Sequence, residues 1–226
     1  MKVLVTGGAG FIGTHVLVRL IESGYCPVVL DNFSNSDIKW FNYFKIDRKV
    51  KIINCDLSDQ DKTSEAFDII FEKLKSTPEV WHFAANSDIS RGLEDPLLDL
   101  NQTFMTTFNL LNNCKKHKIN KFYFASSSAI YGDHGDKALQ ESTGPLMPIS
   151  NYGAMKLASE AFCFSSLESF LDKLRIFRFP NVVGIPATHG VIYDFIKKLI
   201  LNPKVLNVLG NGSQRFGTKN KNGPLK

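Results

Sequence analysis

Tyr152 and Lys156, two residues with complementary acid–base chemistry, lie four positions apart in the sequence. If this stretch is helical, the spacing puts both side chains on one face of the helix. Tyrosine is a poor base near neutral pH because its unperturbed pKa is about 10. We expect the neighbouring ammonium group to favour the phenolate and to lower the pKa of Tyr152. The pair could then remove a hydroxyl proton while a hydride leaves the same carbon atom.

A run of three serines, Ser126, Ser127 and Ser128, ends an apolar segment that predicts a strand. A hydroxyl group at this position could form a hydrogen bond with the reacting oxygen atom and so position it. An alternative interpretation, open for each of the three, is that the serine only caps the turn before Tyr131. His82 lies within another apolar segment, which favours a buried histidine of the core over a catalytic base.

A glycine-rich turn separates the first apolar segment from the first helical pattern, with Gly7, Gly10 and Gly13 spaced as G-x-x-G-x-x-G. Glycines let the backbone turn tightly and approach a pyrophosphate, whose charge a helix N-terminus stabilises. Asp31 follows 18 residues after Gly13. A carboxylate there can accept hydrogen bonds from a ribose diol and would repel a 2′-phosphate. The pattern therefore predicts NAD in preference to NADP, with an Asp31 that only caps a turn as the alternative.

Asp56 stands directly behind a third apolar segment, in the sequence Cys55-Asp56-Leu57. Its carboxylate could accept a hydrogen bond from the amino group of an adenine ring. It could equally cap the start of the helix that follows, since Asp is a preferred N-cap residue.

Short apolar segments alternate with longer helical patterns along most of the chain. This alternation indicates βαβ units and a parallel sheet that is buried on both faces. Right-handed crossovers then give a doubly wound, Rossmann-type α/β fold with helices on both faces of the sheet. The predicted strands are Lys2–Val5, Pro27–Leu30, Val50–Ile53, Val80–Phe83, Lys121–Ala125 and Leu174–Phe179. The predicted helices are Phe11–Ser23, Thr63–Lys75, Thr103–Lys116, Tyr152–Leu171 and Val191–Leu201.

The pattern changes after Pro180, where periodicity becomes weak apart from one helical stretch. We predict an NAD-binding domain over residues 1–180, a partial substrate-binding lobe over 181–214 and a disordered basic tail over 215–226. The formal net charge is +5, and four of the 27 basic residues lie in that tail, which has no acidic residue. The other 23 basic residues nearly balance the 22 acidic ones. This distribution disfavours nucleic-acid binding, which usually needs a basic patch on the fold itself.

The sequence offers no sign of a metal site, a signal peptide or a membrane span. The four cysteines have no metal-binding spacing, and we expect them to be buried, reduced thiols: Cys26, Cys55, Cys114 and Cys163. Glycines interrupt the apolar N-terminus, and no cleavage site follows it. No apolar stretch reaches the length of about 18 residues that a membrane span needs. We therefore predict a cytoplasmic protein that binds no metal, membrane or nucleic acid.

Taken together, these motifs resemble the extended short-chain dehydrogenase/reductase family, in particular its NAD-dependent nucleotide-sugar epimerases of the UDP-glucose 4-epimerase type. The resemblance covers residues 1 to about 214. Thr6–Gly13 matches the cofactor turn of the family, and Phe124–Gly132 is similar to its serine segment. Ser150–Glu160 resembles its Tyr/Lys helix, and Asn181–Gly184 is similar to the segment whose asparagine faces the sugar nucleotide.

The resemblance implies that Ser127, Tyr152 and Lys156 are catalytic, with Tyr152 as the base, Ser127 on the reacting oxygen and Lys156 on the nicotinamide ribose. It implies NAD binding by Gly7, Gly10, Phe11, Ile12, Gly13, Asp31, Asn32, Asp56, Leu57, Phe83, Ala84, Ala85, Thr103, Tyr152, Lys156 and Pro180. It implies substrate binding by Ser87, Ser128 and Asn181. The expected reaction is epimerisation of a nucleotide-diphosphate sugar, a UDP-sugar in the simplest case, through a keto intermediate. A homodimer is one assembly compatible with it.

Departures from the family pattern narrow this expectation. Ser127–Ala129 stands where dehydratases of the family carry Thr-Asp-Glu, which argues against 4,6-dehydration. Thr103 replaces a helical asparagine, and Ile185 and Pro186 replace a Pro-Arg pair, so a substrate-binding or structural arginine is absent. Family members are usually longer, so the resemblance implies a C-terminally truncated chain. A truncated, catalytically weak or inactive NAD-binding module is therefore the alternative hypothesis.

Overall fold

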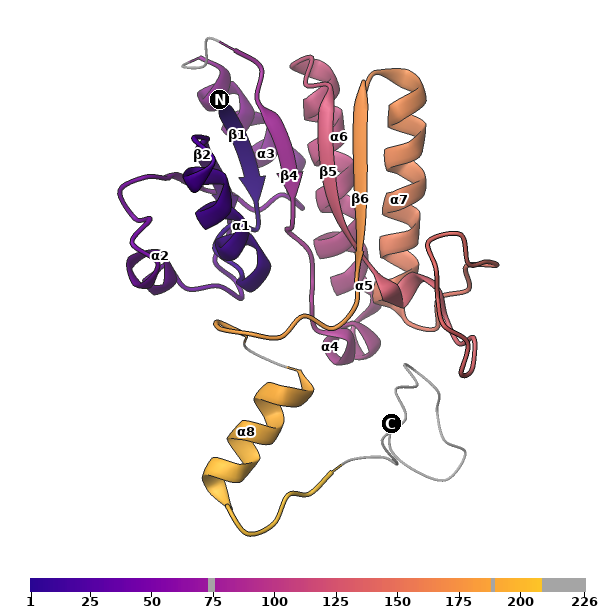
Figure 1. The fold of residues 1–226 in the computed structure, drawn as a ribbon. Helices are drawn as coiled ribbons and strands as arrows, with labels where there is room; N and C mark the ends of the chain where they lie inside the picture. Colours follow the sequence, from indigo (N-terminus) through magenta and orange to yellow (C-terminus); the bar gives the residue numbers. More distant parts are fainter. Residues whose placement is uncertain (73–75, 188–189, 209–226) are drawn as a thin grey trace.

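A parallel six-stranded sheet with helices on both faces forms the body of the computed structural model, which describes residues 1–72, 76–187 and 190–208 (Figure 1). The sheet has the order β3-β2-β1-β4-β5-β6, and every neighbouring pair is parallel. This order places a topological switch point between β1 and β4, where ligands bind in doubly wound folds. The predicted Rossmann-type α/β fold is therefore confirmed. The strands are β1 (Lys2–Thr6), β2 (Cys26–Asp31), β3 (Lys51–Asn54), β4 (Glu79–His82), β5 (Lys121–Ser127) and β6 (Lys173–Phe179).

The long helices lie near their predicted positions, and the short helices are additions to the prediction. Helices of four to six residues contain less than two turns and therefore leave almost no periodic signal. The end of the helix predicted over Thr63–Lys75, at residues 73–75, lies outside the described residues. The helices are α1 (Phe11–Glu22), α2 (Lys39–Tyr43), α3 (Gln60–Phe71), α4 (Ile89–Glu94), α5 (Pro96–Asp99), α6 (Thr106–Lys116), α7 (Asn151–Ser169) and α8 (Val191–Leu201).

The helix predicted over Thr103–Lys116 begins earlier than expected. Asp95 caps α5 by accepting a hydrogen bond from Leu97 N at 3.0 Å, and Pro96 occupies the first helical position, where proline is favoured. A π-helical segment, Leu100–Met105, then joins α5 to α6. Single-turn π segments often occur at functional sites.

Two hydrophobic cores, one on each face of the sheet, hold the helices in place. Alternate residues of β1 point to opposite faces, so that Leu4 belongs to the core under α3, α6 and α7, whereas Val3 and Val5 belong to the core under α1 and α2. Burial on both faces explains why the strands are continuous apolar runs in the sequence.

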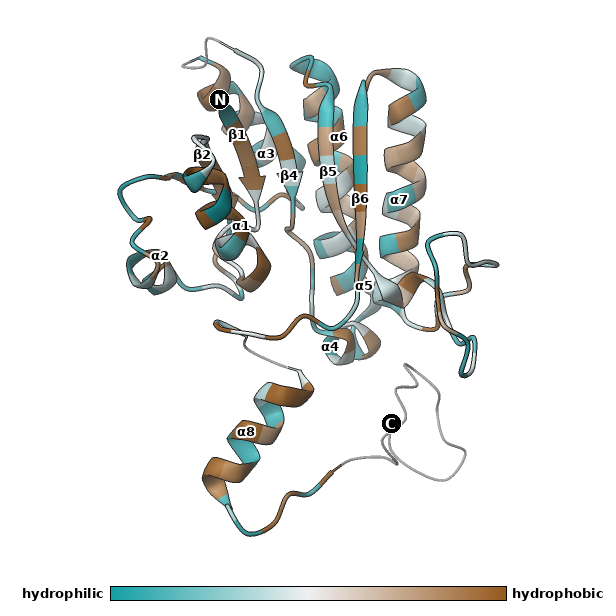
Figure 2. Cartoon of the chain, in the orientation of Figure 1, coloured by the Kyte–Doolittle hydropathy of each residue, from teal (hydrophilic) through white to brown (hydrophobic). Residues whose placement is uncertain are grey.

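Beyond β6 the chain leaves the sheet, and α8 forms where it was predicted. Most apolar side chains of α8 are exposed, namely Val191, Ile192, Tyr193, Ile196, Leu199, Ile200 and Leu201, whereas Phe195 is half-buried. Figure 2 shows this helix with bands of both hydrophobic and hydrophilic residues, apart from the body of the sheet. The division into domains at residue 180 stays a prediction, and the predicted tail over 215–226 lies outside the described residues. Over the ranges that the structure describes, no helix combines the length and apolar character needed to cross a membrane.

Candidate functional site

Most of the predicted site residues follow strand ends that share one edge of the sheet, whereas Tyr152 and Lys156 lie on α7 and Thr103 lies on the π-helical segment. Because all the strands are parallel, their carboxyl ends meet there, and this is the edge where such sheets bind ligands. The last residues of the six strands are Thr6, Asp31, Asn54, His82, Ser127 and Phe179.

The turn after β1 packs closely against neighbouring backbone. Gly7 adopts a φ of +64°, and a Cβ atom on it would lie 2.6 Å from the amide nitrogen of Ala84 in the segment after β4. A Cβ atom on Gly13 would overlap the carbonyl oxygen of Gly7. Gly10, the N-cap of α1, makes no side-chain capping bond. Within the described part of the chain, no side chain caps the first N–H groups of α1, so they are available to an anion such as the pyrophosphate of a dinucleotide.

Asp31, at the end of β2, ties this turn to the neighbouring strand. Its Oδ2 accepts a hydrogen bond from Ala9 N at 2.9 Å. Its Oδ1 accepts from Phe33 N at 2.9 Å and from Ser36 Oγ at 3.0 Å. The carboxylate therefore does cap the turn after β2. It also keeps acceptor capacity for a ribose hydroxyl, because each carboxylate oxygen has two acceptor sites.

Asp56 lies beside Asn32, another residue predicted to contact the cofactor. Burial opposes ionisation of Asp56, but hydrogen bonds from Ser58 and Asn32 outweigh it and lower the pKa of this carboxyl. The alternative that Asp56 caps α3 is wrong, because Asp59 is the N-cap and accepts hydrogen bonds from the first turn. The side chain of Leu57 is buried in the core, and its carbonyl oxygen accepts hydrogen bonds from Asn109 and Thr63.

A close approach between α7 and the end of β5 creates the corner that holds Tyr152. Ser150 caps α7 by accepting a hydrogen bond from Gly153 N at 3.1 Å. A Cβ atom on Gly153 would lie 2.5 Å from Ala129 O, so the first turn of the helix packs directly on the segment after Ser127. The sequence analysis missed Gly153, although a glycine inside a helical Tyr-x-x-x-Lys stretch was a visible signal.

Lys156 is 3% exposed and lies under this corner. Its Nζ donates a hydrogen bond to Ala125 O at 2.6 Å and lies 4.9 Å from the centroid of the Phe124 ring. Burial lowers the pKa of Lys156 to about 8. An ammonium group carries three N–H donors, and Ala125 O is its one hydrogen-bond acceptor among the described residues. Two donors therefore remain for a bound molecule.

The pKa of Tyr152 moves opposite to the expectation. Burial raises it to about 12, a hydrogen bond with Ser127 lowers it, and the charge of Asp99 raises it. The Lys156 ammonium lies 5.8 Å from the centroid of the Tyr152 ring. The expected lowering is therefore wrong for the chain without a ligand, because burial disfavours the phenolate more strongly than its neighbours favour it. Ser127 also caps the turn after β5, since its Oγ accepts a hydrogen bond from Ala129 N.

The remaining predicted residues differ in their exposure. Phe83, Ala84 and Ala85 follow β4 and are partly buried beside the glycine turn, whereas Ser87, Pro180 and Asn181 are exposed and Ser128 is half-buried. Thr103 is 1% exposed, and its hydroxyl has no hydrogen-bond partner in the described ranges. The structure therefore gathers the cofactor and catalytic residues at one edge but leaves two predicted substrate contacts open to solvent.

His82 is a histidine of the core, as expected. One ring nitrogen lies 2.6 Å from Thr6 Oγ1 and the other 3.0 Å from Thr107 Oγ1. Burial, with a smaller contribution from the charge of Lys156, lowers the pKa of His82 well below its usual range. The ring is therefore neutral and links β1 to α6.

Arg178 on β6 is a site-supporting residue that the sequence analysis missed. Its guanidinium group forms a two-pronged ion pair with Glu160 of α7, at 3.0 and 2.9 Å. It also donates to Tyr131 Oη at 3.1 Å and to Glu141 O at 2.8 Å. One side chain thus joins β6, α7 and the segment after the serine run.

The segment after β6 crosses the sheet edge towards α1. A Cβ atom on Gly184 would lie 3.3 Å from Phe11 Cζ, and Ile185 O lies 2.6 Å from His15 Nε2. The segment that carries Asn181 is therefore held next to the N-terminus of α1. No sequence signal pointed to His15.

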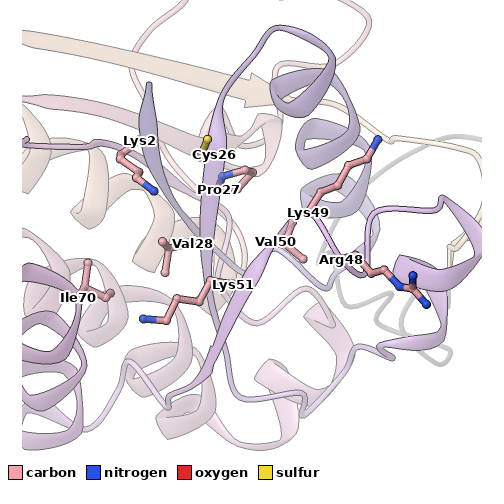
Figure 3. A pocket seen from close by; sticks show the side chains of 9 residues that line it. All are labelled: Lys2, Cys26, Pro27, Val28, Arg48, Lys49, Val50, Lys51 and Ile70. Atoms are coloured by element: carbon pink, nitrogen blue, oxygen red, sulfur yellow. The ribbon is translucent and has the colours of Figure 1, made fainter. Parts of the chain in front are cut away.

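A cavity of about 410 Å³ lies at the opposite end of the sheet (Figure 3). It is lined near the amino ends of β1, β2 and β3 by Lys2, Cys26, Pro27, Val28, Arg48, Lys49, Val50, Lys51 and Ile70. Cys26 is exposed, so the expected burial of the thiols is correct for the other three cysteines only. Because ligands of doubly wound sheets bind at the carboxyl edge, this cavity is separate from the candidate site.

Comparison with known proteins points to one group of enzymes. The chain is 32% identical over 217 residues to a putative UDP-glucose 4-epimerase of Methanocaldococcus jannaschii, covering 94% of this chain and 67% of that protein. It is similar to the crystal structure of the Thermus thermophilus UDP-glucose 4-epimerase in complex with NAD, with a TM-score of 0.75 and 34% identity over 84% of this chain and 58% of that one. It is also similar to the Thermotoga maritima UDP-glucose 4-epimerase with UDP-glucose, with a TM-score of 0.77 and 29% identity over 89% of this chain and 63% of that one.

These coverages mean that the chain spans about three fifths to two thirds of the length of the three relatives. The profile of the NAD dependent epimerase/dehydratase family matches residues 3–216, which include the glycine turn, the serine run and the Tyr/Lys helix. With that match over nearly the whole sequence, the chain belongs to the NAD-dependent epimerase/dehydratase family.

Proposed function

We propose that the chain binds NAD and a UDP-sugar and inverts the sugar at C4 by removing and returning a hydride at that carbon. The observation that carries this proposal is the corner where Tyr152, Ser127 and Lys156 meet, at the same sheet edge as the glycine turn. The matching family and the UDP-glucose 4-epimerase relatives support it.

Several features of the chain fit NAD. The glycine turn leaves space that a Cβ atom would fill, and α1 presents free N–H groups to a pyrophosphate. Asp31 can accept a hydrogen bond from a ribose hydroxyl, and Asp56 can accept one from the adenine amino group. The free N–H donors of Lys156 can donate hydrogen bonds to the hydroxyls of the second ribose. When bound, NAD supplies the hydride acceptor and a positively charged ring that favours a phenolate nearby.

In this proposal Tyr152 acts as the base. It takes the proton of the C4 hydroxyl as the hydride leaves the same carbon, so that the sugar becomes a ketone. Ser127 holds the reacting oxygen by a hydrogen bond. After the keto sugar turns over, Tyr152 returns the proton and the opposite face of C4 receives the hydride, which inverts the configuration. Because burial holds the pKa of Tyr152 near 12, the base needs the positive charges of Lys156 and of the cofactor.

Substrate contacts are proposed at Ser87, Ser128 and Asn181. The three residues belong to different segments that follow β4, β5 and β6. Ser87 and Asn181 are exposed, so their side chains are free to meet a ligand placed over the edge.

The test is incubation of the purified, NAD-loaded protein with UDP-glucose and UDP-N-acetylglucosamine, followed by NMR assignment of the C4 configuration. We expect conversion by the parent and a loss of at least about a hundredfold in Tyr152→Phe, which lacks the proton-accepting oxygen. Equal behaviour of the two proteins, with no conversion of either sugar, would contradict the proposal.

An NAD-binding protein without turnover is the second candidate. The exposure of Ser87 and Asn181 leaves these side chains free to contact a ligand, but it also means that the described residues enclose little of a sugar bound there, which favours the second candidate. Calorimetry separates the two candidates. Tight NAD binding without measurable affinity for UDP-glucose supports the second candidate, and micromolar affinity for UDP-glucose contradicts it.

Assembly and location remain predictions. The exposed apolar side chains of α8 favour self-association, since contiguous apolar patches on soluble proteins usually mark interaction sites. Light scattering of the purified chain tests the homodimer, and a well-behaved monomer would contradict it. Microscopy of a tagged chain in cells tests the cytoplasmic location.

A further inference from the structure

Asp99, the last residue of α5, is a buried carboxyl that the proposed mechanism does not use. It is 0% exposed. Its Oδ1 accepts a hydrogen bond from Asn86 Nδ2 at 2.7 Å, whereas its Oδ2 has no hydrogen-bond partner among the described residues. A buried carboxyl with an unpaired oxygen is costly, and such a group is more than a space-filling side chain.

On one side, Asp99 fixes the loop after β4 through Asn86, which is 3% exposed. The Asn86 side chain also donates to Asp88 O and accepts from Asp88 N, both at 3.0 Å. The Asn86 backbone N–H donates to Gln102 O at 3.2 Å. This loop carries Ser87, one of the proposed substrate contacts. Asp99 thus anchors the loop to α5 through its hydrogen bond with the Asn86 side chain.

On the other side, Asp99 packs against α4 and, through it, against the Tyr152 helix. The Oδ2 atom occupies the space that a Cβ atom on Gly92 would need. Gly92 O in turn accepts a hydrogen bond from Asn151 Nδ2 at 2.9 Å, and Asn151 is the first residue of α7 and the neighbour of Tyr152. Both α4 and α5 pack on α7.

From these contacts we propose that Asp99 is a positioning residue for Tyr152: its carboxyl locks the loop after β4 and α4 against the first turn of α7. The proposal rests on the proposed function, because it is the orientation of the base towards a substrate that Asp99 would set. The lock runs from Asn86 through Asp99 and Gly92 to Asn151, and each step is a direct contact.

The carboxyl also acts on Tyr152 through its charge. The charge of Asp99 raises the pKa of Tyr152. Burial and the charge of Asp88 raise the pKa of Asp99 itself, whereas the hydrogen bond from Asn86 lowers it. Among the described residues, the charged or titratable groups beside these contacts include Asp88 before α4, Arg91 on α4, Asp99 on α5, and Tyr152 and Lys156 on α7. A residue that merely filled space would leave the ionisation of Tyr152 unchanged.

Two substitutions separate position from charge. Asp99→Asn keeps the shape and an acceptor for Asn86 but removes the charge, whereas Asp99→Leu removes the hydrogen bond as well. Glu65→Gln, an exposed carboxyl on α3, is the control for loss of a charge elsewhere. Each variant is made with fluorinated tyrosine, whose phenol ionises at a lower pH. The Tyr152 signal is assigned by its disappearance from the ¹⁹F NMR spectrum of Tyr152→Phe.

We expect the ionisation midpoint of Tyr152 to shift downward in Asp99→Asn and to stay unchanged in Glu65→Gln. We expect kcat to remain within about twofold of the parent in Asp99→Asn and to fall about tenfold or more in Asp99→Leu, because a small misplacement of a catalytic group is expensive. The Kd for NAD should stay the same in Asp99→Asn and Glu65→Gln, since neither change loosens the loop after β4 or touches the glycine turn.

A folded Asp99→Asn variant with the midpoint of the parent, or an Asp99→Leu variant with parental kcat, would overturn the proposal. If Asp99→Leu does not fold, Asn86→Ala takes its place, because it removes the other half of the same hydrogen bond and should cause the same loss of kcat. If the parent shows no turnover, the proposed function is contradicted but the role of Asp99 is not. The ¹⁹F ionisation midpoints then still test whether Asp99 acts on Tyr152.

Discussion

At the glycine turn, backbone packs on backbone, whereas at the Tyr152 corner, buried ionisable side chains pack on one another. The amide of Ala84 occupies the place where a side chain on Gly7 would begin. The corner instead depends on Lys156, Tyr152 and the pair of Arg178 with Glu160, all of which carry or exchange charge. The turn should therefore respond to added volume and ignore pH, and the corner should respond to both charge and pH.

The largest effect is expected for Gly7→Ala, compared with Gly135→Ala as a matched control. Both glycines have a φ of +64°, but a Cβ atom on Gly135 meets nothing within 4 Å, whereas one on Gly7 meets Ala84 N at 2.6 Å. The free energy of unfolding of the control should fall by only about 1 kcal/mol, the cost of placing a residue with a Cβ atom in the left-handed conformation. Gly7→Ala should lose about 3 kcal/mol or more from added overpacking, together with NAD binding.

Urea denaturation and calorimetry with NAD measure the two parts of this prediction. Equal losses of unfolding free energy in both variants would show that conformation alone, and not close packing with the segment after β4, requires Gly7.

The second effect concerns the ion pair that holds the corner. Glu160 is 3% and Arg178 18% exposed at the side chain, and removing one partner of a buried pair leaves the other charge unpaired. We expect Arg178→Met to lower the free energy of unfolding by about 3 kcal/mol. Arg19→Met, which breaks the exposed pair with Glu22, should change little. Thermal or urea unfolding compares the four proteins, including the double variant Arg178→Met/Glu160→Met.

The double variant sharpens the result. It should be more stable than Arg178→Met alone, because no charge is then left buried without a partner. A single variant as stable as the parent would mean that the pair adds no support to the corner.

The third effect is a pH dependence that the turn should lack. The pKa of Lys156 is about 8 in the folded chain and 10.5 as the unperturbed value, so the unfolded chain binds more protons between these two values. Folding stability from this group therefore rises as the pH increases through that window. We expect the unfolding free energy of the parent, minus that of Lys156→Met, to grow by about 2 kcal/mol between pH 7 and 9.5.

Subtraction of the Lys156→Met variant removes the contributions of other groups, among them Cys55, whose raised pKa acts in the opposite direction. If the difference in unfolding free energy between the parent and Lys156→Met stays constant or falls over this pH range, the lowered pKa of Lys156 is contradicted.

The same contrast explains what the sequence could predict. Strands buried on both faces appear in the sequence as continuous apolar runs, and a glycine turn appears as a glycine motif. The fold and the cofactor turn could therefore be predicted from local sequence. The Tyr152 corner could not be predicted in this way, because the hydrogen bond from Lys156 to Ala125 and the pairing of Arg178 with Glu160 join distant segments. The pKa of Tyr152 was predicted in the wrong direction because its charged neighbour is visible in the sequence but its burial is not.

The smallest effect tests whether the turn is purely steric. Asp31 is the carboxylate of this region, and its two oxygens already accept hydrogen bonds from Ala9, Phe33 and Ser36. If a ribose diol also binds there, Asp31→Asn should weaken NAD about tenfold, the value of one charge-assisted hydrogen bond, and should narrow the preference over NADP. Asp37→Asn, which removes an exposed carboxylate beside Lys39, should leave both affinities unchanged. Calorimetry with NAD and NADP tests this prediction. An unchanged NAD affinity in Asp31→Asn would mean that this carboxylate only caps the turn and does not bind a ribose.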